Sequence, residues 1–282
     1  MISNKQSIAL RKINAYALLT VMVIVAVGML FPFFLVIINA FKTPAEYATI
    51  GPLAFPKSLY LKGIVTFWKR VSFGKSLINS FVISISVSIL AIIFSSLNAF
   101  ALGIGKIKGR GILLVLFIVA NTLPHESLAY PLYYLAKLFN IYDTQLVVII
   151  IFTAIQSAFG TYLLSSIYSK FPVEILEAAR IDGCTKLDLL LRIILQNSKA
   201  PLSVLFTFFF IWTWNEFFLP LIMLISTSKQ TVPIAISLTQ GQHNMDVTMA
   251  SASAMLGIIP CIIFFIIFQR TLTRGITAGS VK

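Results

Sequence analysis

Few side chains in this sequence could do chemistry. The 282 residues include nine Asp and Glu and two His, and two of the acids, Glu126 and Glu216, lie inside long apolar stretches. No phosphate-binding glycine loop, nucleophile elbow or metal-ligand spacing accompanies them. We therefore expect no catalytic residue, no metal site and no cofactor bound by this chain. Solute binding and conformational change remain as roles for the two acids.

The residues that precede Glu216 include two tryptophans and an asparagine: Trp212, Trp214 and Asn215. An ionisable side chain at membrane depth usually faces a cavity or a partner, and aromatic rings beside amides suit stacking and hydrogen bonding to a sugar. These four residues and Glu126 are our candidates for a translocation pathway or gate. Two structural alternatives stay open: Glu216 pairs within the helix bundle, and Glu126 belongs to a local network where a helix breaks after Pro124.

A polar stretch, residues 168–200, holds four of the nine acids: Glu174, Glu177, Asp182 and Asp188. Pro172 suits the first position of a helix, and Gly183 suits a left-handed cap at its end. Thr185 and Asp188 have the spacing of a capping box for a second helix. The pattern predicts a helix–turn–helix that enters the water phase between two membrane spans.

The two helices of this hairpin are expected to differ in their surroundings. Ala178 and Ala179 give the first helix a small-residue face that another surface can approach closely. The second helix repeats apolar residues at helical spacing, namely Leu187, Leu190, Leu191 and Ile194. We expect the second helix to pack under the bundle while the first points outward. A cytoplasmic hairpin without a partner is the alternative.

The composition identifies an integral membrane protein. Hydrophobic residues make up 58% of the chain and charged residues 11%, with a mean hydropathy of +0.94, whereas soluble domains carry about 25% charged residues. A helical span needs about 20 apolar residues. We predict a single domain, residues 1–282, with spans at about 14–38, 76–104, 112–136, 144–167, 201–225 and 250–269. Continuous apolar runs of this length exclude the short alternating strands of a barrel.

The basic residues indicate the orientation in the membrane. The net charge is +13, and more Lys and Arg fall on the side that holds both termini and the 168–200 loop than on the other side. An excess of these residues in short loops marks the cytoplasmic side. The loop at 42–75, with six basic residues, is the exception. We expect both termini in the cytoplasm of a bacterial cell and interpret the charge as a topology signal, not as nucleic-acid binding.

Short motifs along nearly the whole chain resemble those of a known family, and they occur in the same order as in that family. Glu177-Ala178-Ala179, Gly183, Ile193 and Leu195 resemble the signature loop of the membrane subunits of ATP-binding-cassette (ABC) importers, although the family has a proline where this chain has Gln196. Further matches resemble the carbohydrate-uptake branch, the MalG-like permeases: Leu123-Pro124, Pro131-Leu132-Tyr133, Ile181-Asp182, Trp214-Asn215-Glu216-Phe217, Pro220-Leu221, Arg274-Gly275 and Thr277-Ala278-Gly279. Pro201 is expected to supply the missing helix break.

This resemblance implies an all-α integral membrane fold, the type I ABC importer permease fold, with six transmembrane helices and a cytoplasmic coupling helix between helices 4 and 5. It implies a second permease subunit in a heterodimer, two cytoplasmic ATPase subunits that bind ATP and Mg, and an extracytoplasmic solute-binding protein. The implied ATPase-coupling residues are Glu177, Ala178, Ala179, Asp182 and Gly183. The implied contacts with the binding protein are Gln240, Gly241 and Gln242.

Functions other than a sugar importer fit the sequence less well or stay open. An ion-coupled secondary transporter would need carboxylates deep in several spans and usually shows internal repeats, but only Glu126 and Glu216 are available and no repeat is visible. A permease for a non-sugar solute such as glycerol phosphate is a further alternative. A membrane-bound enzyme is disfavoured because no catalytic constellation was found. The sequence does not identify which sugar is carried.

Overall fold

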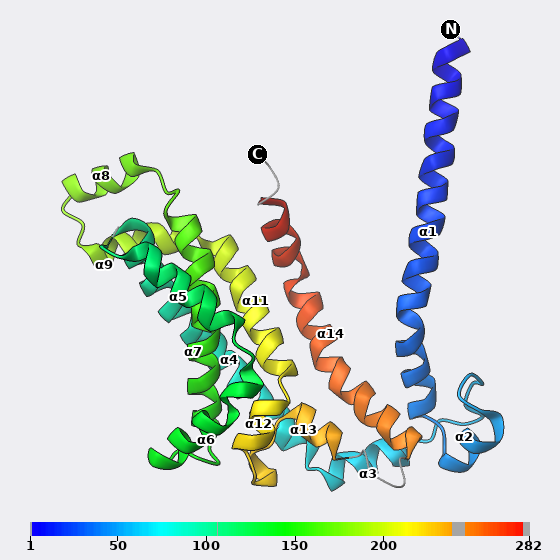
Figure 1. Ribbon diagram of the computed structural model, residues 1–282. Coiled ribbons are helices and arrows are strands. Elements are labelled where there is room, and N and C mark those ends of the chain that lie inside the picture. Colours follow the sequence, from blue (N-terminus) through cyan, green and yellow to red (C-terminus); the bar gives the residue numbers. More distant parts are fainter. Residues whose placement is uncertain (1, 106, 239–245, 279–282) are drawn as a thin grey trace. The chain divides into compact units, whose positions relative to one another are not determined.

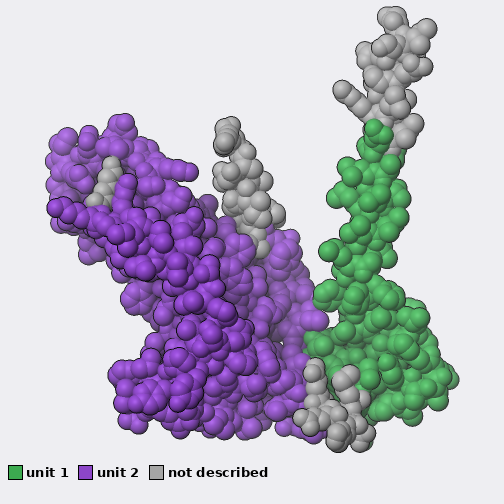
Figure 2. Space-filling view, viewed as in Figure 1, with its two compact units in different colours: residues 1–67, 239–256 green, residues 68–238, 257–282 purple. Residues whose placement is uncertain are grey.

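The described part of the chain is helical throughout. The computed structural model describes residues 2–105, 107–238 and 246–278, and every regular element among them is a helix (Figure 1). The chain separates into two compact units, residues 1–67 with 239–256 and residues 68–238 with 257–282 (Figure 2). Each unit is described by itself below.

The helices follow one another along the chain in this order, with two π-helices and two 3-10 helices labelled η: α1 (Ile2–Ala40), α2 (Pro44–Ile50), α3 (Lys62–Arg70), α4 (Phe73–Ala99), η1 (π, Phe100–Ile104), α5 (Arg110–Thr122), η2 (3-10, His125–Leu128), α6 (Ala129–Leu138), α7 (Gln145–Tyr168), α8 (Val173–Ile181), α9 (Lys186–Asp188), η3 (π, Leu189–Ile194), α10 (Leu195–Asn197), α11 (Lys199–Asn215), α12 (Phe218–Met223), η4 (3-10, Thr227–Lys229), α13 (Val232–Ser237) and α14 (Val247–Ala278).

Four helices in the described residues are long and apolar enough to cross a membrane alone: Asn14–Ala40, Phe73–Ile104, Gln145–Tyr168 and Val247–Gln269. Two more candidates are bent pairs, Arg110–Thr122 with His125–Leu138 at 92° and Lys186–Asn197 with Lys199–Asn215 at 81°. Six spans result when each bent pair counts as one. The predicted spans 112–136 and 201–225 each contain a break in the helix.

Pro124 explains the first interruption. A proline disfavours helical backbone at the residue before it, and Leu123 accordingly has ψ 131°, an extended conformation. The helix α5 therefore ends at Thr122, and the chain turns before η2 begins at His125. The interruption places a short irregular segment, residues 123–124, within the apolar sequence.

Two later prolines account for one helix break just before the fifth predicted span and another within it. A proline ring inside a helix clashes with the carbonyl of the residue four positions earlier. For Pro220 that residue is Glu216, which is extended with ψ 129° and terminates α11. For Pro201 it is Asn197, where α10 ends before Ser198. The expectation that Pro201 supplies the missing break is confirmed.

A buried lysine organises the loop that follows α1 in the first unit. Lys42 is 0% exposed, and its Nζ donates to Asn39 Oδ1 at 2.8 Å, to the Gly51 carbonyl at 2.9 Å and to the Pro52 carbonyl at 3.3 Å. A buried cation needs hydrogen-bond partners to offset its desolvation. Its three acceptors come from the helix end and from the turn after α2, so Lys42 joins these segments.

In the second unit, α4 and α7 approach each other closely over small residues. Three serines of α4, Ser84, Ser88 and Ser95, are all buried. Opposite Ser95 lies Gly160 of α7, where an added Cβ would stand 2.2 Å from the Ser95 Oγ. Small residues at helix contacts are typical of membrane bundles. This pair sets how closely the two helices approach.

A polar cluster around Asp143 joins two segments at the end of the second unit that holds α6 and α12. Asp143, which has a positive φ of 56°, accepts hydrogen bonds from the backbone N–H groups of Ile225 and Ser226, both at 3.0 Å. Lys229 Nζ lies 3.1 Å from its carboxylate. The cluster fixes the loop after α12 to the start of α7. The hairpin of α8 and α9 lies at the opposite end of α7 (Figure 1).

Candidate functional site

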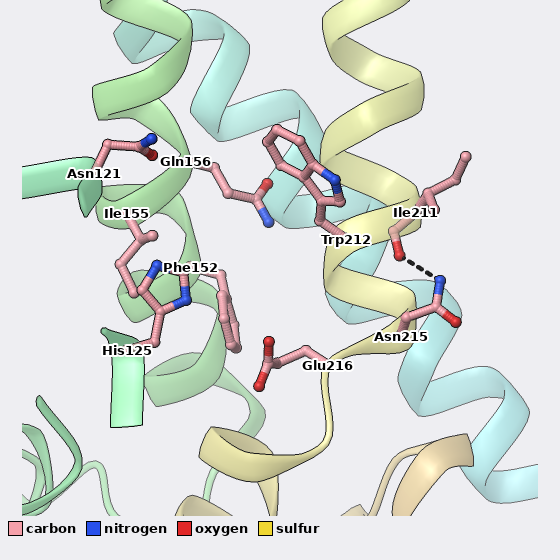
Figure 3. A pocket seen from close by; sticks show the side chains of 9 residues that line it. All are labelled: Asn121, His125, Phe152, Ile155, Gln156, Ile211, Trp212, Asn215 and Glu216. Atoms are coloured by element: carbon pink, nitrogen blue, oxygen red, sulfur yellow. Dashed lines mark hydrogen bonds between the residues drawn. The ribbon is translucent and has the colours of Figure 1, made fainter. Parts of the chain in front are cut away.

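A polar cavity lies between α7 and α11 in the second unit. Its volume is about 400 Å³, and nine described residues line it: Asn121, His125, Phe152, Ile155, Gln156, Ile211, Trp212, Asn215 and Glu216. Figure 3 shows side chains from α7, from α11 and from the segments at both proline interruptions around the same space. The two breaks in the helices therefore supply polar residues to one site.

The broken end of α11 presents Glu216 to this cavity. Because Glu216 is extended and not helical, its side chain leaves the helix axis, and its Oε1 accepts a hydrogen bond from the Phe218 backbone N–H at 3.2 Å. The carboxylate thereby caps the start of α12, a favourable position for a negative group. None of the nine lining residues is Lys or Arg, and the ion pairs found among the described residues do not include Glu216.

An indole and a buried amide complete the polar part of the lining. Trp212 is 44% exposed and is held from behind by Phe208, stacked at 5.7 Å, and by Phe159, edge-on at 5.2 Å. Gln156 is 4% exposed, and its Nε2 donates to Thr213 Oγ1 at 2.8 Å. Its Oε1 has no hydrogen-bond partner among the described residues. The indole is thus held rigidly beside an unsatisfied acceptor.

The structure brings together most of the residues suggested for a pathway. Trp212, Asn215 and Glu216 line the cavity, whereas Trp214 is buried and stacks on Phe210 at 5.7 Å. Glu126 is exposed and lies outside the lining, to which its neighbour His125 contributes. Their role in a pathway stays a prediction.

Sequence reasoning gave too little weight to two amides. Amides in apolar stretches are usually interpreted as helix contacts, but Asn121 and Gln156 both line the cavity, and Gln156 also joins α7 to α11 through Thr213. Their presence in apolar stretches was the available signal. Periodicity could not place them, because the lining forms only where segments far apart in the sequence pack together.

The second candidate site is the hairpin of α8 and α9. Pro172 precedes α8 as its N-cap and does not occupy the first helical position, so that detail of the prediction was wrong. At the other end Gly183 has φ +82°. The Gly183 N–H donates to the Arg180 carbonyl at 3.1 Å and the Cys184 N–H to the Ala179 carbonyl at 3.0 Å. These two bonds form a Schellman cap, and the predicted left-handed cap at Gly183 is confirmed.

The second helix of the hairpin begins as predicted and then departs from the predicted pattern. Thr185 and Asp188 form the expected capping box. Leu190 and Ile194 are buried, but Leu187 and Leu191 are 59% and 48% exposed. The reason is that residues 189–194 form a π-helix, which widens the turn and shifts the buried side away from a regular 3.6-residue repeat.

The two alanines of α8 face different surroundings. Ala179 is 6% exposed and belongs to the hydrophobic core at this end of the unit. Glu177 and Ala178 are exposed, and Ile181 at the end of the helix is 87% exposed. Val173 and Ile175 of the same helix are 53% and 46% exposed, so α8 carries several exposed apolar side chains, as protein-contact surfaces do. The sequence analysis noted Ile181 only as part of the family motif.

Two further expectations concern other residues. Gln240, Gly241 and Gln242 lie outside the described residues. In the described ranges, no group of three or more His, Cys, Asp or Glu is arranged to hold a metal ion.

Comparisons with known proteins give a consistent result. The family model described as binding-protein-dependent transport system inner membrane component matches residues 99–278. The "Probable starch degradation products transport system permease protein AmyC" of Thermoanaerobacterium thermosulfurigenes is 28% identical over 97% of this chain and 100% of its own length. The "Arabinooligosaccharides transport system permease protein AraQ" of Halalkalibacterium halodurans is 31% identical over 89% of this chain and 91% of its own.

The fold also matches a solved structure. A chain from the "crystal structure of a bacterial ABC transporter involved in the import of the acidic polysaccharide alginate" superimposes with a TM-score of 0.79. The match covers 92% of this chain and 96% of the other, at 18% sequence identity. The type I permease fold expected from the sequence is confirmed.

Proposed function

The chain belongs to the family of binding-protein-dependent transport system inner membrane components, and on this premise we propose that it is the translocation subunit of a sugar importer. A multi-pass membrane subunit of this family is a permease and not an enzyme. The energy comes from ATP hydrolysed by partner subunits, and the solute moves inward. Relatives named for starch degradation products, arabinooligosaccharides and diacetylchitobiose support a carbohydrate as the solute.

The observation that carries this proposal is the exposed, rigidly capped hairpin of α8 and α9. Its inner side is anchored in the hydrophobic core through Leu176 and Ala179, while Glu177, Ala178 and Ile181 are exposed. A contact surface that is anchored in the core and capped at the C-terminal end of α8 transmits force to the bundle because it does not yield locally. We propose that an ATPase subunit binds this surface differently in two states and so switches access to the pathway.

The remaining partners complete the proposed complex. A second, different permease subunit lies against this chain in the membrane, and two ATPase subunits bind ATP and Mg on the cytoplasmic side, where both termini of this chain also lie. A solute-binding protein docks on the opposite side. The polar cavity at Trp212 and Glu216 belongs to the pathway through which the solute passes.

A cross-linking pair tests the hairpin contact. Cys184 and Cys261 are first replaced by Ser; Ala178→Cys and Ala179→Cys are then made separately in the complete importer. Because Ala178 is exposed and Ala179 is 6% exposed, only the first should react rapidly with a bifunctional thiol reagent and capture the ATPase. Absence of an ATP-hydrolysing protein from the Ala178→Cys product would contradict the proposal.

A further inference from the structure

The charge of the polar cavity restricts which sugars fit it. Glu216 supplies a carboxylate, and the nine described lining residues include no Lys or Arg. Like charges repel strongly at short range when water is largely excluded. A carboxylate, sulfate or phosphate group on a solute would meet this repulsion, and His125 is the one residue among the nine described lining residues that could offer it a cation.

The hydrogen-bonding groups of the cavity favour a solute that donates hydrogen bonds. Thr213 has one hydroxyl proton, and it is committed to the Phe209 carbonyl at 2.8 Å. The amide nitrogen of Gln156 must therefore face Thr213 at 2.8 Å, which leaves Gln156 Oε1 as the unpartnered acceptor. A buried acceptor without a donor destabilises the arrangement, because it has lost its hydrogen bonds to water. A sugar hydroxyl would remove that deficit.

Gln156 Oε1 is covered by its neighbours in the present arrangement. A solute hydroxyl therefore reaches it only after lining side chains move. The accessible groups, the Trp212 indole and the Glu216 carboxylate, offer a flat surface for the apolar face of a sugar ring and an acceptor for its hydroxyls. Figure 3 shows the two side chains extending from the same end of α11.

We propose that this cavity is a sugar subsite of this subunit that accepts uncharged sugar rings and rejects anionic ones. The inference rests on the proposed function, because it assumes that the cavity belongs to the solute pathway. It separates neutral oligosaccharides from uronic acids, sulfonated sugars and glycerol phosphate as solutes at this site. This selectivity against anionic sugars resides in this chain and is therefore independent of the specificity of a solute-binding protein.

The test measures occupancy of the cavity directly. Asn121→Cys is introduced into the complete importer in which Cys184 and Cys261 are replaced by Ser, and its reaction rate with an uncharged methanethiosulfonate reagent is followed in membranes. The probes are methyl glycosides of glucose, galactose and mannose, each paired with the corresponding uronic acid. His125→Gln is included in the same background, so that no lining imidazole takes part in the comparison.

The expected result is protection by at least one neutral glycoside, with the uronic acid of the same pair at least about tenfold weaker. Glu216→Gln keeps an acceptor for the Phe218 N–H and removes the charge, so it should reduce this preference to less than about threefold. Glu46→Gln is the matched control, since Glu46 belongs to the first unit and is not among the lining residues; it should leave the tenfold preference unchanged. Gln156→Leu should weaken protection by the neutral glycosides.

Three results would overturn the inference: no protection by any neutral glycoside, equal protection by a uronic acid, or an unchanged preference in Glu216→Gln. ATP-dependent sugar uptake by the same complex is measured in parallel. If uptake persists while one of these results is found, only the subsite inference fails. If no ATP-dependent uptake is seen with any sugar, the proposed function itself fails.

Discussion

At Gly183 the backbone adopts a conformation that few residue types tolerate. Its φ is +82°, and an added Cβ would meet nothing within 4 Å, so a substitution there is penalised by backbone strain and not by a clash. Gly183→Val should destabilise the hairpin turn by about 1–2 kcal/mol. Gly183→Asn should be close to the native protein, because Asn tolerates the left-handed region.

Limited proteolysis within residues 168–200, together with uptake, measures this difference. The Val variant should be cleaved faster and transport less than the Asn variant while both remain in the membrane. Equal cleavage and equal uptake by the two variants would show that the Schellman cap does not hold the hairpin in its functional form.

Asp143 acts through its charge and through its backbone. The Ser226 hydroxyl and backbone N–H and the nearby Lys229 ammonium lower the pKa of its carboxyl from 3.8 to about 2, against the opposing effect of burial. The folded state therefore holds this proton less readily than the unfolded chain does. The carboxylate stabilises the fold above about pH 4 by at most about 2 kcal/mol, and this contribution disappears as the pH falls to about 2.

Two substitutions at Asp143 separate these effects. Asp143→Asn retains an acceptor and suits the positive φ of 56°, whereas Asp143→Ala loses both advantages. Thermal unfolding in detergent at pH 7 should rank the native protein above Asn and Asn above Ala. The gap between the native protein and Asn should narrow toward pH 2. A gap that does not depend on pH would exclude the ion-pair explanation.

At the scale of the helices, the closest contact is between Gly160 of α7 and Ser95 of α4. A Cβ at Gly160 would also lie 3.0 Å from Phe209 of α11, so a side chain there must separate the helices. Gly160→Ala should destabilise the bundle by about 1–3 kcal/mol, as overpacking does in other cores. Gly111→Ala, where nothing lies within 4 Å, is the control. Equal melting temperatures for the two variants would contradict the close contact.

The elements could be predicted from the sequence where the signal was local. Apolar length predicted four uninterrupted spans, and the turn at Gly183 and the capping box at Thr185 followed from residue type and spacing. A helix break after Pro124 was an open alternative, whereas the interruption at Glu216 was not predicted although Pro220 was visible. Hydropathy is averaged over a window of residues, so a single proline hardly changes it. The proline ring nevertheless clashes with the helical backbone before it and ends the helix. The buried side of η3 could not be predicted, because the π-helix changes the periodicity itself.

At the scale of the whole molecule, the described chain combines an apolar bundle with a polar cavity at two helix breaks and an exposed hairpin. The sequence predicted three residues of the cavity, Trp212, Asn215 and Glu216, because they cluster along the chain. It assigned Trp214 to the same group, although the helix turns that ring into the core. Gln156 joins the site only through the packing of α7 on α11, a contact between distant segments that local patterns do not contain.

The most direct test of the account is ATP-driven sugar uptake by proteoliposomes that contain the complete importer with Glu177→Lys. Glu177 is exposed on α8, so the substitution should leave folding intact and reverse the charge of the surface proposed to contact the ATPase. The account predicts that uptake falls by at least about tenfold, the effect of losing about 1.4 kcal/mol of coupling, while the permease remains in the membrane in normal amount. Uptake at the native rate would contradict it.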